Sequence, residues 1–337
     1  VLEAVAQSNS GLRQTERLTL TVDRVAPQIQ LSSPASAYVR GVEGVIGSIT
    51  DLHLSSYALR LSGLDPVMAT TEIASGSDER IAFRFADLGG YADGLYRLDI
   101  LAEDEAENRG EGSTQFVIDN TPPVVALTAP ASGLLVSSKN GALDITGTID
   151  ERNLKLFSLN LGQGAPPYGS VLASGASLPV SPTLHALNVA GLADGGYTIQ
   201  LRAEDKAGWM TETVANIVVD NTPPIAVLRL PTDGSYVRSA TDVVGTANDA
   251  NLKNYALDIA PGAKAQASRW SEFASGTTGV TDGKLGSLVA LPADGVHSLR
   301  LKVTDKAGNS SEAVTQITVD TTPPAAPINL SAKVENR

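Results

Sequence analysis

The chain has 337 residues and a formal net charge of −12, with 37 acidic against 25 basic side chains. This charge argues against nucleic acid or an anionic membrane as a partner, because both would repel an acidic surface. There is no cysteine, which excludes disulfides and thiolate metal sites, and no stretch reaches the roughly 18 apolar residues of a membrane span. The length and a hydrophobic content of 42% predict two or three globular domains.

The first segment, residues 1–23, is similar to a stretch that returns later in the chain. Its sequence LEAVAQSNSGLRQTERLTLTVD loosely follows LRAEDKAGWMTETVANIVVD, which begins at Leu201. Apolar and polar residues alternate on both sides of a turn there, as in two paired strands. We interpret residues 1–23 as the last strands of a truncated preceding repeat, and we expect the chain to be a segment of a longer array.

Copies of one motif then follow at intervals of about 100 residues. Asp119, Asp220 and Asp320 each stand one residue before Thr-Pro-Pro, and Asp23 takes the same place at the end of the first segment. Three further stretches keep this register, and their first copies read GVIGSITDLHLSSYALRL, ADGLYRLDILAED and DEAENRGEGSTQFVIDNTPP. The motif predicts repeats at 24–119, 120–220 and 221–320.

Within a repeat the pattern has a period of two. In YRLDILAED the apolar Tyr96, Leu98 and Ile100 alternate with Arg97 and Asp99, which is typical of half-buried strands. No window of about a dozen residues shows a helical stripe. Short strands, Ala-Asp-Gly turns and units of this length predict an all-β fold of tandem immunoglobulin-like antiparallel β-sandwiches in an extended array.

A tyrosine follows the Asp-Gly turn in two of the repeats, Tyr96 and Tyr197. It stands where immunoglobulin-like sandwiches carry the tyrosine corner, a phenol that is hydrogen-bonded to the backbone a few residues upstream. The alternative is an ordinary half-buried strand tyrosine. His297 replaces the tyrosine in the third repeat, so the prediction covers two copies.

Each Thr-Pro-Pro ends a strand and stiffens the link to the next repeat. Proline lacks the N–H that a sheet needs, and it restricts the backbone of the residue before it. The link is therefore expected to behave as a short, semi-rigid spacer. Residues 321–337, TTPPAAPINLSAKVENR, read as such a linker and the first strand of a following domain.

These residues resemble a known family. The succession GTID, then ADGGYTIQLRAEDKAG, then VDNTPP is similar to the bacterial immunoglobulin-like (Big and cadherin-like) tandem repeats of large surface and secreted proteins, over nearly the whole of residues 24–320. PPAAPINLSA, near the end, resembles the start of a fibronectin type III-like domain. The resemblance implies the architecture, and it leaves the function open because such repeats serve proteins of several kinds.

In an immunoglobulin-like sandwich the B–C and F–G loops lie at the end where the chain enters. We assign GTID to the end of strand B and AEDKAG to the F–G turn, which brings acidic residues of both loops to the incoming linker. Hard oxygen ligands from three loops are what Ca²⁺ prefers, so we predict inter-domain calcium sites, as in cadherin-like repeats. The predicted ligands are Asp23, Asp51, Glu103 and Asp104 for the first repeat, Asp119, Asn120, Asp150, Glu151, Glu204 and Asp205 for the second, and Asp220, Asn221, Asn248, Asp249 and Asp305 for the third.

The alternative to calcium is that these residues hold their own turns. Asp205 and Asp305 can accept backbone N–H groups of the F–G turn, as aspartate does in Asx-turns. Asp150 can do the same in its loop. The sequence favours this alternative over calcium, since DKAGN is a turn signature without any metal.

The residues needed for catalysis do not come together. His53, His185 and His297 fall at unrelated positions in three different repeats, and the chain has no G-x-S-x-G elbow, phosphate loop or dinucleotide fingerprint. We expect no enzyme. Trp209 and Trp270 could stack on a sugar, but packing in a core or at a sheet edge is the favoured interpretation.

The expected function is structural: a stalk or spacer in a large extracellular or cell-surface bacterial protein, used in adhesion or to present a distal functional domain. Its expected partners are the neighbouring repeats, and beyond them a surface protein or a glycan. Two alternatives stay open, a glycan- or protein-binding module that uses its loops and a subunit of an extracellular filament. The copies differ most at 62–85, 162–185 and 260–288, where loops could carry specific recognition.

Overall fold

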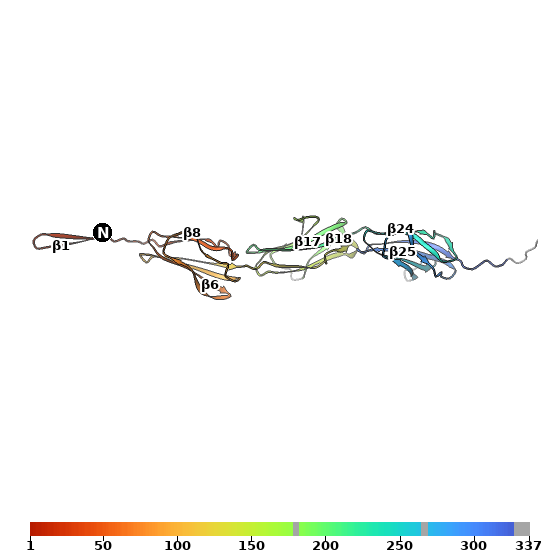
Figure 1. Cartoon of the computed structure of the whole chain (residues 1–337), viewed down its shortest axis with the longest axis horizontal. Helices are drawn as coiled ribbons and strands as arrows, with labels where there is room; N and C mark the ends of the chain where they lie inside the picture. Colours follow the sequence, from red (N-terminus) through yellow and green to blue (C-terminus); the bar gives the residue numbers. More distant parts are fainter. Residues whose placement is uncertain (178–181, 264–268, 327–337) are drawn as a thin grey trace, which may run out of the picture. The chain divides into compact units, whose positions relative to one another are not determined.

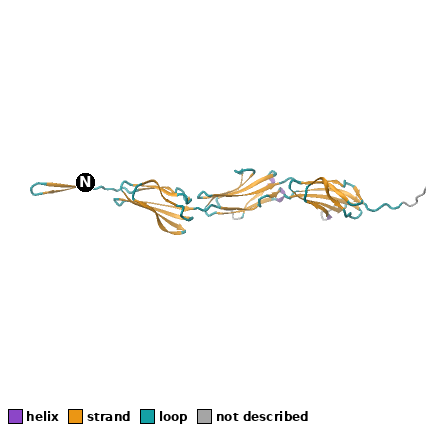
Figure 2. Ribbon diagram, in the orientation of Figure 1, coloured by secondary structure: helices purple, strands orange, loops and turns teal. Residues whose placement is uncertain are grey.

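The structure is a computed structural model that describes residues 1–177, 182–263 and 269–326. Strands dominate these ranges (Figure 2), and the helical elements include the short 3₁₀ turns η1 (Ser138–Asn140) and η2 (Val189–Gly191). None of the described helices is long and apolar enough to cross a membrane. The all-β prediction is confirmed.

The strands of residues 28–118 form two sheets (Figure 1), with the orders β3-β5-β8 and β4-β10-β9-β6-β7. In chain order they are β3 (Gln28–Ser33), β4 (Tyr38–Val39), β5 (Gly44–Thr50), β6 (Leu54–Asp65), β7 (Val67–Gly76), β8 (Arg80–Asp87), β9 (Gly94–Asp104) and β10 (Arg109–Ile118). These orders correspond to strands A-B-E and A′-G-F-C-C′ of an immunoglobulin-like sandwich.

The same pair of sheet orders recurs twice, as β11-β13-β16 with β12-β18-β17-β14-β15 and as β19-β21-β24 with β20-β26-β25-β22-β23. The first set comprises β11 (Val124–Ala129), β12 (Leu134–Val136), β13 (Ala142–Asp150), β14 (Leu154–Gly162), β15 (Ser170–Gly175), β16 (Thr183–Asn188), β17 (Gly195–Asp205) and β18 (Met210–Val219). The second comprises β19 (Ile225–Leu230), β20 (Ser235–Val237), β21 (Thr241–Asn248), β22 (Leu252–Pro261), β23 (Ser271–Gly276), β24 (Val280–Leu288), β25 (Gly295–Asp305) and β26 (Ser310–Val319). The tandem sandwich prediction is therefore confirmed.

Contacts divide the chain into two compact units that do not follow the sequence repeats. Unit 1 comprises Val1–Val124 with Ile149–Phe157 and Arg202–Thr211, and unit 2 comprises the remainder. The B–C and F–G loops of repeat 2 thus belong to the same unit as repeat 1. The first two linkers lie within unit 1, and the third lies within unit 2.

Burial follows the alternation of the sequence. In β9, Tyr96, Leu98 and Ile100 are buried, and Arg97 between them is exposed. The buried side chains of repeat 1 form one cluster that also holds Phe116 of β10. With few aromatic residues, the cores are built mainly from branched aliphatic side chains, as the composition predicts.

The tyrosine corner is present in both predicted copies. The hydroxyl groups of Tyr96 and Tyr197 donate to the backbone oxygen of the alanine four residues upstream, at 2.9 and 3.1 Å. His297 makes the same bond through Nε2, at 2.7 Å. Since a carbonyl only accepts, Nε2 of His297 carries the hydrogen, and the histidine therefore replaces the tyrosine in function as well as in position.

The two ends of the chain lie outside these sheets. Residues Leu2–Gln7 (β1) and Arg13–Leu18 (β2) form an antiparallel hairpin in which every residue is exposed. An isolated two-stranded hairpin is marginally stable at best in water, and its interpretation as the end of a preceding repeat stays a prediction. The strand predicted within 321–337 falls largely on residues 327–337, outside the described residues.

Candidate functional site

Side chains at the linkers between repeats form several hydrogen bonds. At the end of repeat 1, Asp93 from the Ala-Asp-Gly turn accepts two hydrogen bonds, from Asn120 N to Oδ1 at 2.7 Å and from Thr121 Oγ1 to Oδ2 at 2.5 Å. We call this carboxylate the linker clamp. It explains why Asp-Gly and Asn-Thr-Pro-Pro recur together, because the turn of one repeat holds the linker that leaves it.

The linker clamp recurs in both later repeats. Asp194 accepts from Asn221 N at 2.8 Å and from Thr222 Oγ1 at 2.5 Å, and Asp294 accepts from Thr322 Oγ1 at 2.6 Å. The hydrogen bond from Thr222, followed by that from the Asn221 backbone, lowers the pKa of Asp194 below its ordinary value. The bond from Thr322 does the same to the pKa of Asp294, so both clamps are ionised at neutral pH.

The linker asparagines, predicted as metal ligands, bind the backbone instead. Asn120 Oδ1 accepts from Gly41 N at 2.6 Å, and its Nδ2 donates to Tyr91 O at 3.2 Å. Asn221 Oδ1 accepts from Ser138 N at 2.8 Å in the same way. Both amide groups are therefore used to fix the linker to the repeat that precedes it.

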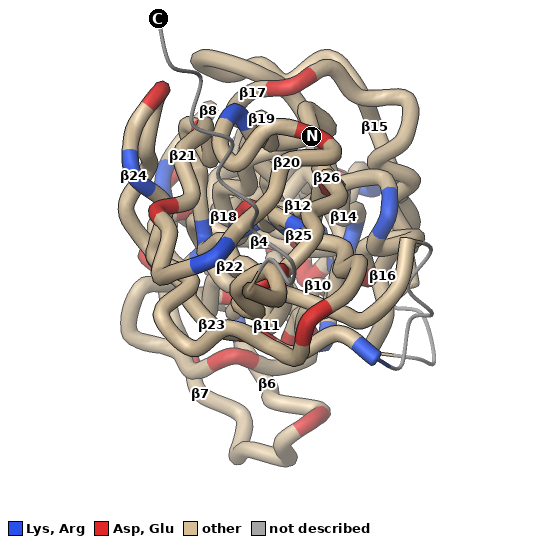
Figure 3. Tube along the Cα trace, turned by 90° about the vertical axis from the view of Figure 1, so that its right-hand side faces the viewer, with Lys and Arg blue, Asp and Glu red and all other residues tan. Residues whose placement is uncertain are grey.

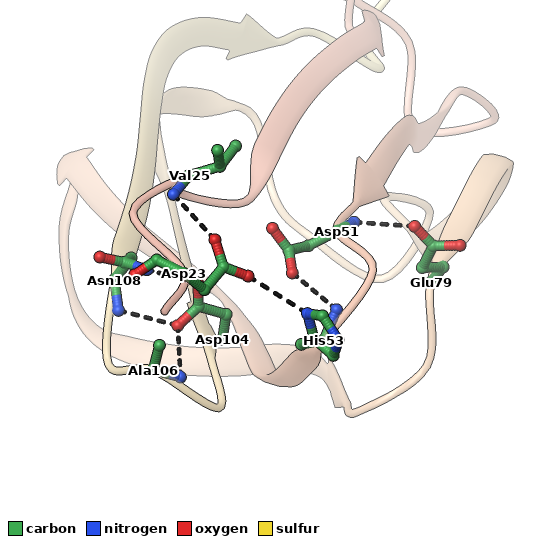
Figure 4. A network of polar contacts seen from close by, with 8 residues as sticks. All are labelled: Asp23, Val25, Asp51, His53, Glu79, Asp104, Ala106 and Asn108. Carbon is green, nitrogen blue, oxygen red and sulfur yellow. Dashed lines mark hydrogen bonds and ion pairs between the residues drawn. The ribbon is translucent and has the colours of Figure 1, made fainter. Parts of the chain in front are cut away.

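The first linker aspartate, Asp23, meets the B–C loop of repeat 1 (Figure 4). Its Oδ1 accepts from Val25 N at 3.0 Å, and its Oδ2 lies 3.2 Å from Nδ1 of His53. Asp51 accepts from the backbone N–H of His53 at 2.8 Å and so shapes the loop. The bond from Val25, and then that from His53, lowers the pKa of Asp23.

An asparagine replaces His53 in the two later copies. Asn153 Nδ2 donates to Asp119 Oδ2 at 2.8 Å, and Asn251 Nδ2 donates to Asp220 Oδ2 at 2.6 Å. Asp119 and Asp220 are only 3% and 7% exposed, so these donors satisfy carboxylates that are out of reach of bulk water. Each linker aspartate is thus tied to the repeat that follows it.

The F–G aspartate of repeat 1 is satisfied within its own turn (Figure 4). Asp104 Oδ1 accepts from Ala106 N at 2.8 Å and from Asn108 N at 2.9 Å. Its Oδ2 accepts from Asn108 Nδ2 at 2.7 Å, and the same nitrogen lies 3.3 Å from Asp23 O in the linker. One asparagine side chain therefore joins the F–G turn to the incoming linker.

Repeat 3 has the same arrangement, and its aspartate and asparagine are buried. Asp305 and Asn309 are 0% and 1% exposed. Asn309 Nδ2 donates to Asp305 Oδ2 at 2.8 Å and to Asp220 O at 2.7 Å, and Asn309 N donates to Asp305 Oδ1 at 2.8 Å. Both oxygens of this buried carboxylate have donors.

Repeat 2 lacks that donor, because Trp209 stands in the place of the asparagine. Its backbone N–H donates to Asp205 Oδ1 at 2.8 Å, and its indole Nε1 donates to Asp119 O at 3.0 Å. The bond to the linker is kept, but Asp205 Oδ2 is buried without a hydrogen-bond partner. Burial, and then the negative charge of Asp119, raises the pKa of Asp205.

An acidic cavity of about 570 Å³ lies beside this linker in unit 1. Burial raises the pKa of Glu151 in its wall, and the charges of Asp119, Asp205 and Asp150 add to that increase. The charged residues that line the cavity are Asp65, Asp93, Asp119, Asp150, Glu151 and Arg152. The whole chain has 37 acidic and 25 basic residues, which Figure 3 marks along the Cα trace, and this wall has five acidic residues and one basic residue.

Among the described residues, two groups of side chains have ligand atoms within 4.8 Å of one another: Asp23, Asp51 and His53, and Asp220, Asp249 and Asp305. The loops therefore gather carboxylates as predicted. In the second group, however, Asn251 and Asn309 already donate to Asp220 and Asp305. Asp305 also accepts the backbone N–H of Asn309 in its own turn, and calcium binding at these groups stays a prediction.

Two predicted ligands have partners elsewhere. Glu103 Oε2 lies 3.2 Å from Arg109, and Glu204 Oε1 lies 2.6 Å from Lys155. Both pairs lie between adjacent strands of the larger sheets, so these glutamates serve the sheets rather than the linkers. Neither belongs to the two groups described above.

The tryptophans pack against arginine. The Arg40 guanidinium lies 4.5 Å from the ring centre of Trp209, and that of Arg300 lies 4.5 Å from the ring centre of Trp270. Both indoles are half-buried. The packing interpretation accounts for both contacts, which are cation–π pairs.

The sequence analysis missed the nitrogen donors of these junctions. Asn153 and Asn251 occupy the position of His53, and Asn108 and Asn309 occupy that of Trp209. The register of the repeats was the signal that could have found them, since a polar side chain recurs at each position. A search for acidic ligands does not find these asparagines. The role of an amide group is recognised only when the carboxylate to which it donates is known.

Protein-family models and curated proteins give no match to this chain. Among solved structures, it is similar to a tetra-tandem repeat in the extending region of a large adhesion protein, at 21% identity and a TM-score of 0.37, over 95% of this chain and 81% of that one. A 1.5-MDa bacterial ice-binding adhesin studied for host cell surface retention matches at 16% identity and a TM-score of 0.31, over 89% and 100% of the chains. Domains EC1–4 of Drosophila N-cadherin match at 13% identity and a TM-score of 0.28, over 94% of this chain and 82% of that one.

The sheet orders and the recurring linker contacts define the class of this protein without those likenesses. Each sheet pair has the A-B-E and A′-G-F-C-C′ orders. The chain consists of tandem immunoglobulin-like β-sandwiches.

Proposed function

We propose that this chain is a structural spacer of an extracellular bacterial protein, one that holds a distal functional domain at a set distance from a surface. The observation that carries the proposal is the linker clamp. Asp93 and Asp194 hold successive linkers to the repeat behind, and Asn153 and Asn251 hold the same linkers to the repeat ahead. A link bonded on both sides transmits orientation from one sandwich to the next.

The energetics support a stiff link. A net hydrogen bond contributes about 0.5–1.5 kcal/mol, and more when one partner is charged, and each linker receives several. The two prolines add rigidity without any hydrogen bond, because proline has one free backbone torsion. Bending the link would break bonds to charged groups with no equal replacement.

The cell-surface part of the proposal draws on the resemblance to bacterial immunoglobulin-like repeats. A stalk needs solubility and independence of redox conditions, and a chain with net charge −12 and no cysteine has both. Adhesion is the process in which such a stalk would serve. We assign it no catalytic role, and its first partners are its own neighbouring repeats.

Small-angle X-ray scattering of the chain tests the spacer. The pair Asp93→Ala and Asp194→Ala removes two clamps, and Asp78→Ala, a 79% exposed carboxylate, is the control. We expect the wild type and the control to give the same narrow distance distribution, and the clamp variant to give a broader one. Identical curves for all three proteins would reject the clamp as the source of stiffness.

Calcium binding at the junctions is a second proposal, and the observation that favours it is the group Asp220, Asp249 and Asp305 with ligand atoms within 4.8 Å. A bound cation would add oxygen coordination to carboxylates that already accept N–H groups. Thermal unfolding in calcium and in EGTA tests it. A transition at the same temperature in both solutions would remove calcium from the account and leave the hydrogen-bonded clamp.

A further inference from the structure

Two side chains of repeat 1 contact the F–G turn of repeat 2 within unit 1. Tyr38 and Arg40, at the end of β4, reach the turn Lys206-Ala207-Gly208-Trp209. Arg40 Nε donates to Ala207 O at 3.0 Å, and its guanidinium covers the Trp209 ring at 4.5 Å. Lys206 Nζ lies 3.3 Å from the Tyr38 hydroxyl and 4.9 Å from its ring centre. Both gripping side chains are half-buried.

The same two side chains recur in repeat 3 as Tyr236 and Arg238. The short strands β4 and β20 pair in parallel with the last strand of their repeat, with Val39 opposite Ile118 and Val237 opposite Val319. A tyrosine precedes each valine and an arginine follows it. The backbone therefore presents both pairs at the same place on their sandwiches.

Repeat 2 carries a different pair, and the turn that it meets is different too. Leu135 and Ser137 stand in place of the tyrosine and the arginine. Ser137 Oγ donates to Ala307 O at 3.0 Å, in a turn whose last residue is Asn309. Within this chain, then, the arginine accompanies a turn ending in tryptophan and the serine accompanies a turn ending in asparagine.

The tyrosine and arginine of repeat 3 are exposed, whereas those of repeat 1 are half-buried. Tyr236 is 77% exposed, and Arg238 is exposed. Within the described residues, Arg238 makes no hydrogen bond, ion pair or ring contact. A cavity of about 460 Å³ lies against both side chains, with Thr232 and Asp242 in its wall.

The linker that leaves repeat 3 already has the geometry of the other two. Asp320 N donates to Val237 O at 3.1 Å, as Asp119 N donates to Val39 O at 2.9 Å. Asp294 clamps the linker threonines. The carboxylate of Asp320 is exposed and has no partner among the described residues, whereas those of Asp119 and Asp220 are buried against an asparagine.

We infer that Tyr236 and Arg238, with Asp320, form a docking surface for the F–G turn of another immunoglobulin-like repeat. The partner carries the sequence Asp-Lys-Ala-Gly-Trp in that turn and an asparagine or histidine in its B–C loop. Its lysine lies on Tyr236, its tryptophan ring lies under Arg238, and its loop side chain donates to Asp320. A turn ending in asparagine would leave Arg238 without a ring.

The turn of this chain that has this sequence, Asp205–Trp209, is already held by Arg40, and its indole donates to Asp119 O. A second copy would have to give up those contacts to fill the surface. The occupant is therefore a further repeat that brings its own turn. This inference goes beyond the spacer role, since it holds equally for repeats that bind a ligand.

A chimera tests the inference directly. Residues 1–324 are followed by a second copy of residues 124–220, which continues the Thr-Pro-Pro linker in register and supplies the turn. The readout is the chemical shift of the Arg238 δ-methylene protons, because an indole ring over the guanidinium moves them upfield. We expect an upfield shift that matches the one of Arg40, and its loss when Trp209→Asn is made in the appended copy alone.

The appended copy must show the methyl spectrum of native repeat 2, which excludes misfolding as a cause of a negative result. A second measurement needs no added repeat: the wild-type chain is titrated with a backbone-cyclised peptide of residues 203–211. Arg238→Ser should weaken peptide binding by roughly threefold or more, the effect of one exposed cation–π contact. An unshifted Arg238 in the folded chimera, or equal shifts with tryptophan and asparagine, overturns the inference.

Discussion

Replacing Asp205 with asparagine should stabilise the protein, although the residue is fully buried and lies in a linker junction. Asp205 Oδ1 accepts from Trp209 N, and Oδ2 has no donor. In Asp205→Asn the amide oxygen keeps the bond to Trp209, and an NH₂ group replaces the unpartnered oxygen. A donor then faces surroundings that hold the carboxylates of Asp119 and Glu151.

The magnitude follows from the cost of an unsatisfied buried group, about 1–3 kcal/mol. We expect Asp205→Asn to add about 1–2 kcal/mol at pH 7, the lower part of that range. One kcal/mol moves the melting temperature of a 100-residue domain by roughly 4–8 °C. The gain should therefore be measurable by calorimetry of the full chain.

The pH dependence has a definite sign. Burial and the charge of Asp119 raise the pKa of Asp205 in the folded state, so folding takes up a proton as the pH falls through that value. The wild type thus gains stability on acidification and loses it as the pH rises. The advantage of Asp205→Asn should be largest at neutral pH and should shrink as the pH approaches the ordinary pKa of aspartate.

Asp305→Asn is the matched control in repeat 3. There Oδ2 accepts from Asn309 Nδ2 at 2.8 Å, so the new NH₂ group would face another NH₂ group. We expect a loss of about 1–3 kcal/mol. Hydrogen exchange of β17 and β25 amides assigns each change to its repeat. If Asp205→Asn destabilises repeat 2 as Asp305→Asn destabilises repeat 3, the unpartnered oxygen does not cost stability in the wild type and the reasoning fails.

Three further predictions concern the corner and the linkers. Tyr96→Phe removes the bond to the backbone and should lower the free energy of unfolding by about 1 kcal/mol in urea titrations, whereas His297→Tyr should change it by less than about 0.5 kcal/mol; equal effects would contradict the shared corner. Asn251→Ala removes the donor to the buried carboxylate of Asp220 and should speed amide exchange several-fold in the linker that precedes repeat 3; unchanged exchange would contradict the bond between that linker and repeat 3. The bonds to Asp194 should hold above the ordinary pKa of aspartate and be lost as the pH falls through its lowered folded value, so NMR of Thr222 should show Asp194→Asn to be less acid-sensitive than the wild type.

The sandwiches could be predicted from the sequence because short stretches of neighbouring residues determine their strands and turns. The alternation around Leu98 and the turn before Tyr96 need only a few neighbouring residues, and both recur in each copy. The placement of the B–C and F–G loops at the linkers also holds, with Asp150 ending β13 and Asp205 ending β17. A repeated pattern defines strands and their ends without knowledge of distant contacts.

The chemistry of the junctions could not be predicted in the same way. The carboxylates gather as expected, but whether an ion or an amide satisfies them depends on side chains from three separate segments. Asn309 joins Asp305 to the backbone of Asp220, which is 89 residues away. The sequence DKAGN alone does not show that its asparagine contacts a distant linker. The sequence DKAGW alone does not show that Asp205 lacks a donor to its second oxygen.

The parallel pairing at the ends of each sandwich has a mechanical consequence. β4 lies near the start of repeat 1 and β10 at its end, and they are joined by bonds such as Val117 N to Ala37 O at 2.7 Å and Asp119 N to Val39 O at 2.9 Å. Tension on the polypeptide slides two parallel strands past each other, so these bonds share the load instead of opening one after another. Each sandwich therefore resists stretching in shear, and a force on the two ends of a sandwich does not peel its strands apart one bond at a time.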